Sequence, residues 1–393
     1  MIIKNANIVD VNGIIQKDIL IQDGKIAKVE KNIVLDNEEI LDAKGFTVMP
    51  AFIDLHAHFR DPGFTYKEDL YTGCKSAAKG GYTYVNLMAN TNPICSTAEM
   101  AKEIMDRAKK DDICDVHQIV AITKDFDGES IDHLANLPSY IKAVSDDGKG
   151  VTSNDVMARA LKLSAEKGFI VMSHAEDMVI SKYDYRLAEN LETARNVLLA
   201  SYYNAKLHMA HVSTKESMQY IIQAKQNCKG ITCEVEPHHI YFSDNDYKVN
   251  PPIRKEYDRL FLIDSIKNGL VDCIATDHAP HTKEEKENGA PGMVGLETSF
   301  AVCNKVLVKE YGLPLTKLSA LFSYNPAKIM GLNKGEVKVG FDADLVIVDT
   351  ERLWTVDINN FASKSNNTMF EGEELQGEIL TTIKAGKITY KKG

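Results

Sequence analysis

Hydrophobic residues in the middle of the chain fall into short runs separated by longer stretches of mixed polarity. Eight of these runs have the length and composition of buried β-strands: Phe52–His58, Thr83–Met88, Val116–Ile122, Tyr140–Ser145, Phe169–His174, Leu207–His211, Ile231–Glu236 and Cys273–Asp277. The stretches between them include segments with helical periodicity: Lys67–Lys79, Thr97–Lys110, Ser153–Lys167, Tyr185–Asn204 and Lys215–Gln226. This alternation over residues 51–333 predicts an α/β fold of the (β/α)8 TIM-barrel type.

A doubly wound open sheet is the alternative architecture for alternating strands and helices. Such sheets usually carry a Gly-x-Gly-x-x-Gly turn after the first strand, and none follows Phe52–His58. We therefore favour the barrel.

Both ends of the chain have a different pattern, with short strands and turn residues. The N-terminal segment offers Ile2–Val9, Asp18–Ile21 and Lys25–Val29, with Asp23-Gly24 as a hairpin turn. The C-terminal segment offers Ala343–Asp349, Ile379–Ala385 and Lys387–Tyr390. Neither end is long enough to bury a core alone, so we expect residues 1–50 and 334–393 to form one small β-sandwich domain.

Composition narrows the class of protein further. The 393 residues carry 46 basic and 56 acidic side chains, a net charge of −10, which argues against a nucleic-acid or anionic-membrane partner. We expect neither a signal peptide nor a membrane span. The seven cysteines form no Cys-x-x-Cys pair, so we expect a cytoplasmic protein without disulfides.

The most suggestive chemistry lies at the end of the first central strand. His56 and His58 are two residues apart, so both project from one face, and Arg60 can extend that row. Paired neutral imidazoles commonly bind divalent metals. Two structural histidines at a strand end are the alternative interpretation.

Further histidines occur at the corresponding ends of two later strands. His174 ends the fifth strand and His211 the sixth, and the C-terminal ends of barrel strands are where active sites form. This shared placement favours a metal centre. His208 lies three residues before His211, so it faces the other way and is expected to be packed. The remaining His117, His133, His238 and His239 belong to no evident motif.

Carboxylates follow the fourth and eighth strands. Asp277 could bind a metal and carry a proton, or it could cap a helix. Asp146-Asp147-Gly148 could bridge two metals, cap a helix or form a turn. Lys142 is an alternative candidate for the ligand that bridges two metals, because some barrel hydrolases use a carboxylated lysine in that role.

These motifs resemble a known family. The chain is similar to the amidohydrolase superfamily and, within it, to the bacterial type I dihydroorotases. The similarity spans nearly the whole chain and follows the family's order through these segments: Asp54–Pro62, Gly80–Thr83, Met88–Pro93, Ser145–Gly148, Ser173–Asp177, Ala210–Lys215, Glu236–His239, Asn250–Arg254, Ala275–His281, Gly292–Phe300 and Gly340–Asp349.

The resemblance implies a role for each matching residue. It implies two zinc ions, although one is possible, with these ligands: His56, His58 and Asp277 for one ion, His174 and His211 for the other, and Asp147 as the bridge. Asp277 would also be the catalytic acid and base. The substrate, N-carbamoyl-L-aspartate or dihydroorotate, would contact His58, Arg60, Asn90, Asn250, His281 and the backbone at Pro291 and Gly292. The resemblance also implies a homodimer, and in some relatives an association with aspartate transcarbamoylase.

Some segments depart from the family pattern and leave other functions open. Met88-Ala-Asn90 stands where Met-Pro-Asn is usual, Ala290-Pro-Gly292 where Pro-Phe-Gly is common, and the stretch from His174 to Arg195 is short. A dihydropyrimidinase or allantoinase is the alternative enzyme, although their substrates lack the carboxylate that Arg60 would bind. A barrel scaffold without catalysis is a third alternative, but such chains typically lose metal ligands, and here all are present.

Overall fold

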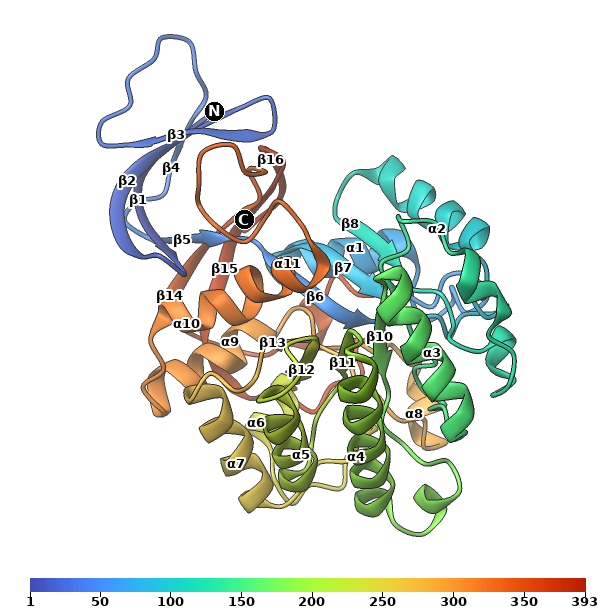
Figure 1. The fold of residues 1–393 in the computed structure, drawn as a ribbon. Coiled ribbons are helices and arrows are strands. Elements are labelled where there is room, and N and C mark those ends of the chain that lie inside the picture. The colour runs from blue at the N-terminus through green and yellow to red at the C-terminus, as the bar shows by residue number, and fades with distance from the viewer.

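A computed structural model describes residues 1–393 (Figure 1). Its strands are β1 (Ile2–Asp10), β2 (Gly13–Gln22), β3 (Lys25–Glu30), β4 (Ile40–Asp42), β5 (Thr47–Pro50), β6 (Phe52–Ala57), β7 (Tyr82–Leu87), β8 (Asp115–Gln118), β9 (Ala143–Val144), β10 (Ile170–Ser173), β11 (Leu207–Met209), β12 (Ile231–Val235), β13 (Cys273–Ile274), β14 (Leu345–Thr355), β15 (Glu374–Lys384) and β16 (Lys387–Lys391).

Helices occupy much of the chain between these strands. The α-helices are α1 (Leu70–Lys79), α2 (Ala98–Asp111), α3 (Asn154–Lys167), α4 (Tyr185–Tyr203), α5 (Lys215–Lys225), α6 (Pro237–Tyr241), α7 (Glu256–Lys267), α8 (Lys283–Glu287), α9 (Ser299–Cys303), α10 (Leu315–Ser319) and α11 (Asn325–Met330). Shorter 3-10 and π segments are η1 (Lys124–Phe126), η2 (Asp132–Asn136), η3 (Ile180–Lys182), η4 (Asn304–Glu310), η5 (Ala320–Tyr324) and η6 (Ile358–Asn360). None of the helices is long and apolar enough to cross a membrane.

The two ends of the chain pair with each other in one eight-stranded sheet. Its order is β16-β15-β14-β5-β1-β2-β3, and β4 also pairs with β1. The first and last parts of the chain therefore lie side by side, in blue and red in Figure 1. Strand β5, which the sequence analysis missed, pairs with β1 on one side and β14 on the other. After the single residue Ala51 the chain enters β6, so this sheet leads directly into the central strands.

All eight central strands are parallel to their neighbours. They form one sheet of order β13-β12-β11-β10-β9 and another of order β6-β7-β8. Isolated parallel bridges join the two sheets at both edges, Val120 to Val144 and Ala57 to His278. The parallel arrangement brings the C-terminal ends of all these strands to one side of the molecule.

The predicted helices are confirmed, with small changes at their starts. Asp69, Thr97, Ser153, Asp184 and Thr214 each accept a hydrogen bond from the backbone three residues ahead. These caps satisfy the free N–H groups of the first turn and fix where each helix begins. The helix expected from Lys67 therefore begins only at Leu70, after the cap at Asp69.

Two of the predicted strands are much shorter than expected. Tyr140–Ser145 is a strand only at Ala143–Val144, because the Lys142 amide donates to His117 Nε2 instead of a ladder partner. Cys273–Asp277 is a strand only at Cys273–Ile274. Beyond it, the Thr276 amide donates to Asp54 Oδ1, and Asp277 has a left-handed φ of 45°. Both shortened strands lead into the loops that carry Asp147 and Asp277.

Candidate metal centre

Strand β6 places His56 and His58 at the C-terminal end of the parallel strands. Both rings lie on one face, with centroids 5.4 Å apart, as the two-residue spacing predicts. Both side chains are buried. The first strand therefore supplies two imidazoles to a closed interior space.

Four other strand ends bring the remaining predicted ligands to the same place. His174 follows β10, His211 follows β11, and Asp277 lies beyond β13. His174 Nδ1 is 2.8 Å from His211 Nε2, and Asp277 Oδ1 is 3.0 Å from His58 Nε2 and 3.6 Å from His56 Nε2. All of these side chains are buried.

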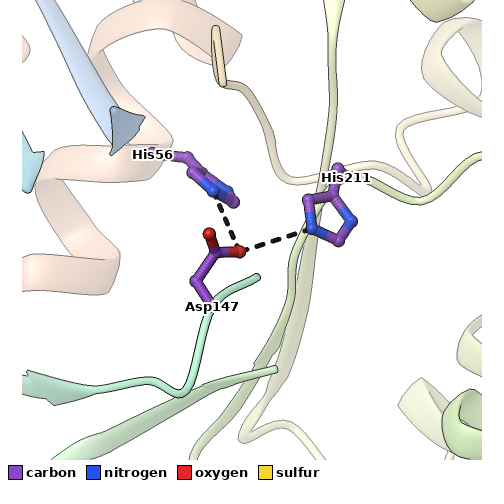
Figure 2. Close-up of side chains that lie close together, drawn as sticks. All are labelled: His56, Asp147 and His211. Atoms are coloured by element: carbon purple, nitrogen blue, oxygen red, sulfur yellow. Dashed lines mark ion pairs between the residues drawn. The ribbon is translucent and has the colours of Figure 1, made fainter. Parts of the chain in front are cut away.

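Asp147, which follows β9, lies at the centre of this group. Its Oδ1 is 3.2 Å from His56 Nε2, 3.3 Å from His174 Nδ1 and 3.5 Å from His211 Nε2. Its Oδ2 is 3.4 Å from His58 Nε2. Figure 2 shows the Asp147 carboxylate between the rings of His56 and His211. The Asp147 carboxylate is therefore buried among four histidine rings and does not lie in a surface turn.

The donor set fits divalent metal ions. Two groups with converging donor atoms share His56: one with His58 and Asp277, the other with Asp147 and His211. His56 Nε2 and Asp147 Oδ1 are buried, yet neither has a hydrogen-bond partner. Leaving such groups unsatisfied typically costs about 1–3 kcal/mol each. Imidazole and carboxylate ligands are those that Zn²⁺ prefers, so bound cations would satisfy both atoms.

The electrostatics of the group show how strongly its carboxylates attract positive charge. Burial opposes the ionisation of Asp147, but the charge of His56 and the nearby rings of His174 and His211 hold its pKa well below the usual range. Burial would likewise lower the pKa of His174, but Asp147 and Glu176 raise that pKa to about 10. The carboxylates of the centre therefore favour positive charge beside them.

A second layer of buried acids holds the histidine rings in place. Glu234 Oε1 lies 2.7 Å from His56 Nδ1, and its Oε2 lies 2.9 Å from His208 Nε2. Glu176 Oε2 lies 2.8 Å from His174 Nε2. Acids that bond the second nitrogen of a metal-binding imidazole fix its tautomer and orientation. The bonds to His56 and His174 leave the opposite nitrogen of each of these two rings facing Asp147.

Asp54, two residues before His56 on β6, supports the site through hydrogen bonds. It accepts hydrogen bonds from the Thr276 hydroxyl, the Thr276 amide and the His56 amide. Burial raises the pKa of Asp54 to about 7 despite these bonds. Asp54 therefore connects β6 to the segment that carries Asp277.

Among the residues predicted to bind substrate, Arg60 and His281 lie together beside the centre. Arg60 Nη2 is 3.3 Å from His281 Nε2, and Arg60 Nε donates to the Pro280 carbonyl. Burial and the positive charges of Arg60 and Lys67 lower the pKa of His281 to about 3, so its ring is neutral. The neutral ring of His281 therefore does not repel the guanidinium of Arg60.

The other predicted substrate residues make contacts within the protein. Asn90 Oδ1 is 2.8 Å from His58 Nδ1, and Asn250 Nδ2 donates to Glu176 Oε2. The Gly292 amide donates to the Lys248 carbonyl, and Pro291 is exposed. Asn90 and Asn250 thus lie beside the histidines, while the Gly292 amide already donates a hydrogen bond within the protein.

The rival ligand Lys142 lies elsewhere. Its Nζ donates to the Met330 carbonyl at 2.8 Å, and the residue precedes β9 rather than following it. His208 is packed between Thr232 and Glu234, as predicted, although it shares Glu234 with His56 and so does not face away from the interior. His117 is also buried, with its Nε2 accepting from the Lys142 amide.

Sequence reasoning missed the supporting acids Glu234 and Glu176 and the group Glu236, His238 and His239. Glu234 lies within a strand between Cys233 and Val235, and a charged residue enclosed in an apolar run was the available signal. Glu176 follows His174 by two residues, a spacing that could have suggested a partner.

Comparison with known proteins gives a consistent result. The amidohydrolase family matches residues 47–389. A dihydroorotase from Clostridium botulinum is 51% identical over 396 residues, and the match covers all of both chains. One from Aquifex aeolicus is 38% identical, covering 100% of this chain and 99% of its own.

Solved structures similar to this chain include a hydantoinase and a dihydropyrimidinase. An L-hydantoinase (dihydropyrimidinase) from Arthrobacter aurescens superposes with a TM-score of 0.91 at 26% identity, covering 100% of this chain and 96% of that one. A dihydropyrimidinase from Brevibacillus agri gives a TM-score of 0.88 at 21% identity, covering 99% and 95%, and so shares the fold.

Proposed function

Because this chain belongs to the amidohydrolase family, and within it to the dihydroorotases, we propose that it interconverts N-carbamoyl-L-aspartate and L-dihydroorotate, a step of pyrimidine biosynthesis. The observation that carries this proposal is the convergence of four histidines and two aspartates from five strand ends on one buried space. Full-length identities of 38–51% to dihydroorotases favour this substrate over those of the hydantoinases, at 21–26%.

We infer that the central strands close into a (β/α)8 barrel over residues 51–333. The bridges at both edges of the two parallel sheets support closure. Residues 1–50 and 334–393 would be the small β-sandwich domain, supported by their shared sheet and by a core cluster drawn almost wholly from these two segments. The metal centre then lies at the barrel end where active sites form.

Two zinc ions are the proposed cofactor. His56, His58 and Asp277 would hold one, His174 and His211 the other, and Asp147 would bridge them. When bound, such ions lower the pKa of water from about 15.7 towards 7 and polarise a carbonyl group. The protein contributes the fixed donor positions described above and the acids that orient them.

Asp277 is the proposed acid and base. In ring opening, water adds to the ring amide carbonyl of dihydroorotate, Asp277 takes the proton of the attacking oxygen, and the C–N bond breaks as that proton passes to the nitrogen. In ring closure the carbamoyl nitrogen attacks the side-chain carboxyl group, its proton passes to Asp277, and water leaves. A neutral carboxyl group loses water more readily than a carboxylate, so lower pH favours closure.

Arg60, Asn90 and His281 are proposed to bind the substrate carboxylate. The planar guanidinium of Arg60 can donate two parallel hydrogen bonds to a carboxylate, which lysine cannot copy. Neutral His281 beside it leaves that charge available to the ligand. His58, Asn250 and the backbone at Pro291 and Gly292 complete the predicted substrate contacts.

A parallel assay tests the proposed substrate. Dihydroorotate, dihydrouracil, hydantoin and allantoin are offered to the purified enzyme before and after chelation and zinc restoration. We expect turnover of dihydroorotate, lost on chelation and restored by zinc. Preference for dihydrouracil, hydantoin or allantoin would overturn the assignment in favour of another cyclic-amide hydrolase.

Arg60→Lys tests the carboxylate site. We expect KM for dihydroorotate to rise about 10-fold to 100-fold, the loss of one strong charged hydrogen bond, with the zinc content unchanged. Arg159→Lys is the matched control, because Arg159 forms an exposed pair with Asp155 on α3. Equal kinetics in Arg60→Lys and the control would remove Arg60 from the substrate site.

The setting of the enzyme in the cell is also a proposal. A cytoplasmic homodimer is the expected form, and association with aspartate transcarbamoylase is an option that relatives suggest. Sedimentation of the purified protein, alone and with that partner, distinguishes these states.

A further inference from the structure

A third group of metal-binding side chains lies beside the proposed pair and shares no residue with it. Glu236, His238 and His239 follow β12 directly, and all three are buried. Their donor atoms lie within 4.8 Å of one another. Because strand side chains alternate, Glu236 faces the same side as Glu234, towards the interior. The group therefore lies at the same end of the strands as the predicted metal ligands.

The hydrogen bonds of His239 determine which of its nitrogens carries the proton. Its Nε2 is 3.1 Å from the Pro251 carbonyl oxygen, which can only accept, so Nε2 carries the hydrogen. A neutral ring then presents the lone pair of Nδ1 to Glu236 Oε2, also 3.1 Å away. Two lone pairs at this distance repel each other unless a proton or a metal cation lies between them.

Two further features of the group point to a cation. Glu236 Oε1 is buried and has no hydrogen-bond partner. The ring of His238 makes no hydrogen bond within the protein, and its centroid is 4.3 Å from that of His239. Unsatisfied buried acceptors are rare in folded proteins, and Glu236 Oε1 is one of them.

We propose that Glu236, His238 and His239 bind a third divalent cation, separate from the proposed pair. Two imidazoles and one carboxylate are a common ligand set for Zn²⁺ and for related first-row metals. Three protein ligands leave at least one position open for water or another ligand. The cation would neutralise the carboxylate and give Glu236 Oε1 and His238 the partner that each lacks.

A proton on Glu236 is the competing explanation for the contact with His239. Protonated Glu236 would donate to His239 Nδ1 and remove the repulsion, although His238 would still lack a partner. Glu236→Gln separates the two explanations. The glutamine amide can donate the same hydrogen bond to His239, but a neutral side chain that presents an N–H group binds divalent cations poorly.

Zinc stoichiometry is the test. The full-length protein is loaded with Zn²⁺, freed of loosely bound metal and analysed by mass spectrometry. We expect three zinc ions per chain in the unmodified protein and two in Glu236→Gln and in His238→Asn. His117→Asn is the matched control, since it also removes a buried histidine that is not fully hydrogen-bonded, and it should retain three. Unchanged stoichiometry in Glu236→Gln, or only two zinc ions in the unmodified protein, would overturn the proposal.

Two measurements keep the test independent of folding and of the proposed activity. Anomalous diffraction at the zinc edge, on crystals of the unmodified protein, should show a peak among Glu236, His238 and His239, and absence of this peak refutes the site. In Asp147→Asn the proposed pair should lose its zinc, while one zinc ion per chain remains. Adding Glu236→Gln to this variant should remove the remaining ion. A failure of the pair is thus distinguishable from a failure of the third site.

Discussion

The two ends of the parallel strands carry opposite kinds of polar residues. At the C-terminal end, histidines and carboxylates are buried and face one another. At the N-terminal end a cavity of about 630 Å³ is bordered by lysines, among them Lys206, Lys229, Lys317 and Lys328, and all four are exposed. Two of these lysines donate to backbone carbonyls, of Gly168 and Lys267.

The difference shows where the fold holds polar groups at a cost in stability. A buried polar atom without a hydrogen-bond partner lowers the stability of the fold by about 1–3 kcal/mol, whereas an exposed lysine side chain remains hydrated. The unpartnered His56 Nε2 and Asp147 Oδ1 lie at the C-terminal end. Residues retained against that cost indicate function, and the lysines at the other end indicate solubility and stability.

The substitution Asp147→Asn is the strongest test of this difference between the two strand ends. Removing the central charge should abolish binding of the proposed zinc pair and lower kcat/KM about 10³-fold or more, since the pair supplies several kcal/mol of transition-state stabilisation. Metal analysis and a dihydroorotate assay measure both. Lys142→Met is the control from the N-terminal end of β9 and should retain metal and activity. Loss of activity in Lys142→Met with retention in Asp147→Asn would make the lysine the bridge.

Glu234→Gln tests the support of His56 and should have the next largest effect. Weakening its contact with His56 Nδ1 should reduce zinc affinity about 10-fold to 100-fold. Competition with a chelating dye measures the affinity. Thr232→Val is the control, because Thr232 contacts His208 but not His56. Similar losses in both variants would show that Glu234 acts through His208 instead.

Glu192 gives a pH-dependent prediction at the C-terminal end. Burial raises the pKa of this carboxyl to about 7, although Arg195 opposes the rise. The folded state therefore binds the proton more tightly, and the resulting stability is present below about pH 4.3 and lost as the pH rises through 7. Chemical denaturation at several pH values should show the free energy of unfolding falling over this window, by at most about 4 kcal/mol. Glu192→Gln should flatten that slope, and an unchanged slope would contradict the assignment.

The smallest effect is expected at the lysine-bordered end. Lys229→Ala combined with Lys328→Ala should change the free energy of unfolding by no more than about 0.5 kcal/mol. Because both side chains are exposed and border the cavity at the opposite end of the strands from the predicted ligands, kcat/KM should also stay the same. Urea denaturation and the dihydroorotate assay check this. A large loss of activity would show that the two ends are coupled.

Periodicity alone predicted the order of the central strands and helices, because apolar runs and helix caps are local features. The lengths of β9 and β13 were not predictable in this way. They depend on bonds from distant residues, His117 to the Lys142 amide and Asp54 to the Thr276 amide. Strand β5 was missed because four buried residues directly before β6 resemble part of the same strand.

The candidate site was predicted better by its position at strand ends than by residue type. Histidines at the ends of β6, β10 and β11 converge as expected, and His208 is packed as expected, but it contacts the same acid as His56. Glu234 could not be assigned from its spacing, since its partners His56 and His208 come from two other strands. Such contacts depend on how strands are arranged in space, which a local pattern does not contain.

The position of β5 between β1 and β14 has a consequence for synthesis of the protein. On the ribosome, β1 and β5 emerge early, but one edge of β5 lacks its partner until residues 345–348 have been translated. An unpaired strand edge is a site of aggregation. The nascent chain must therefore keep that edge covered while the whole catalytic region is being made.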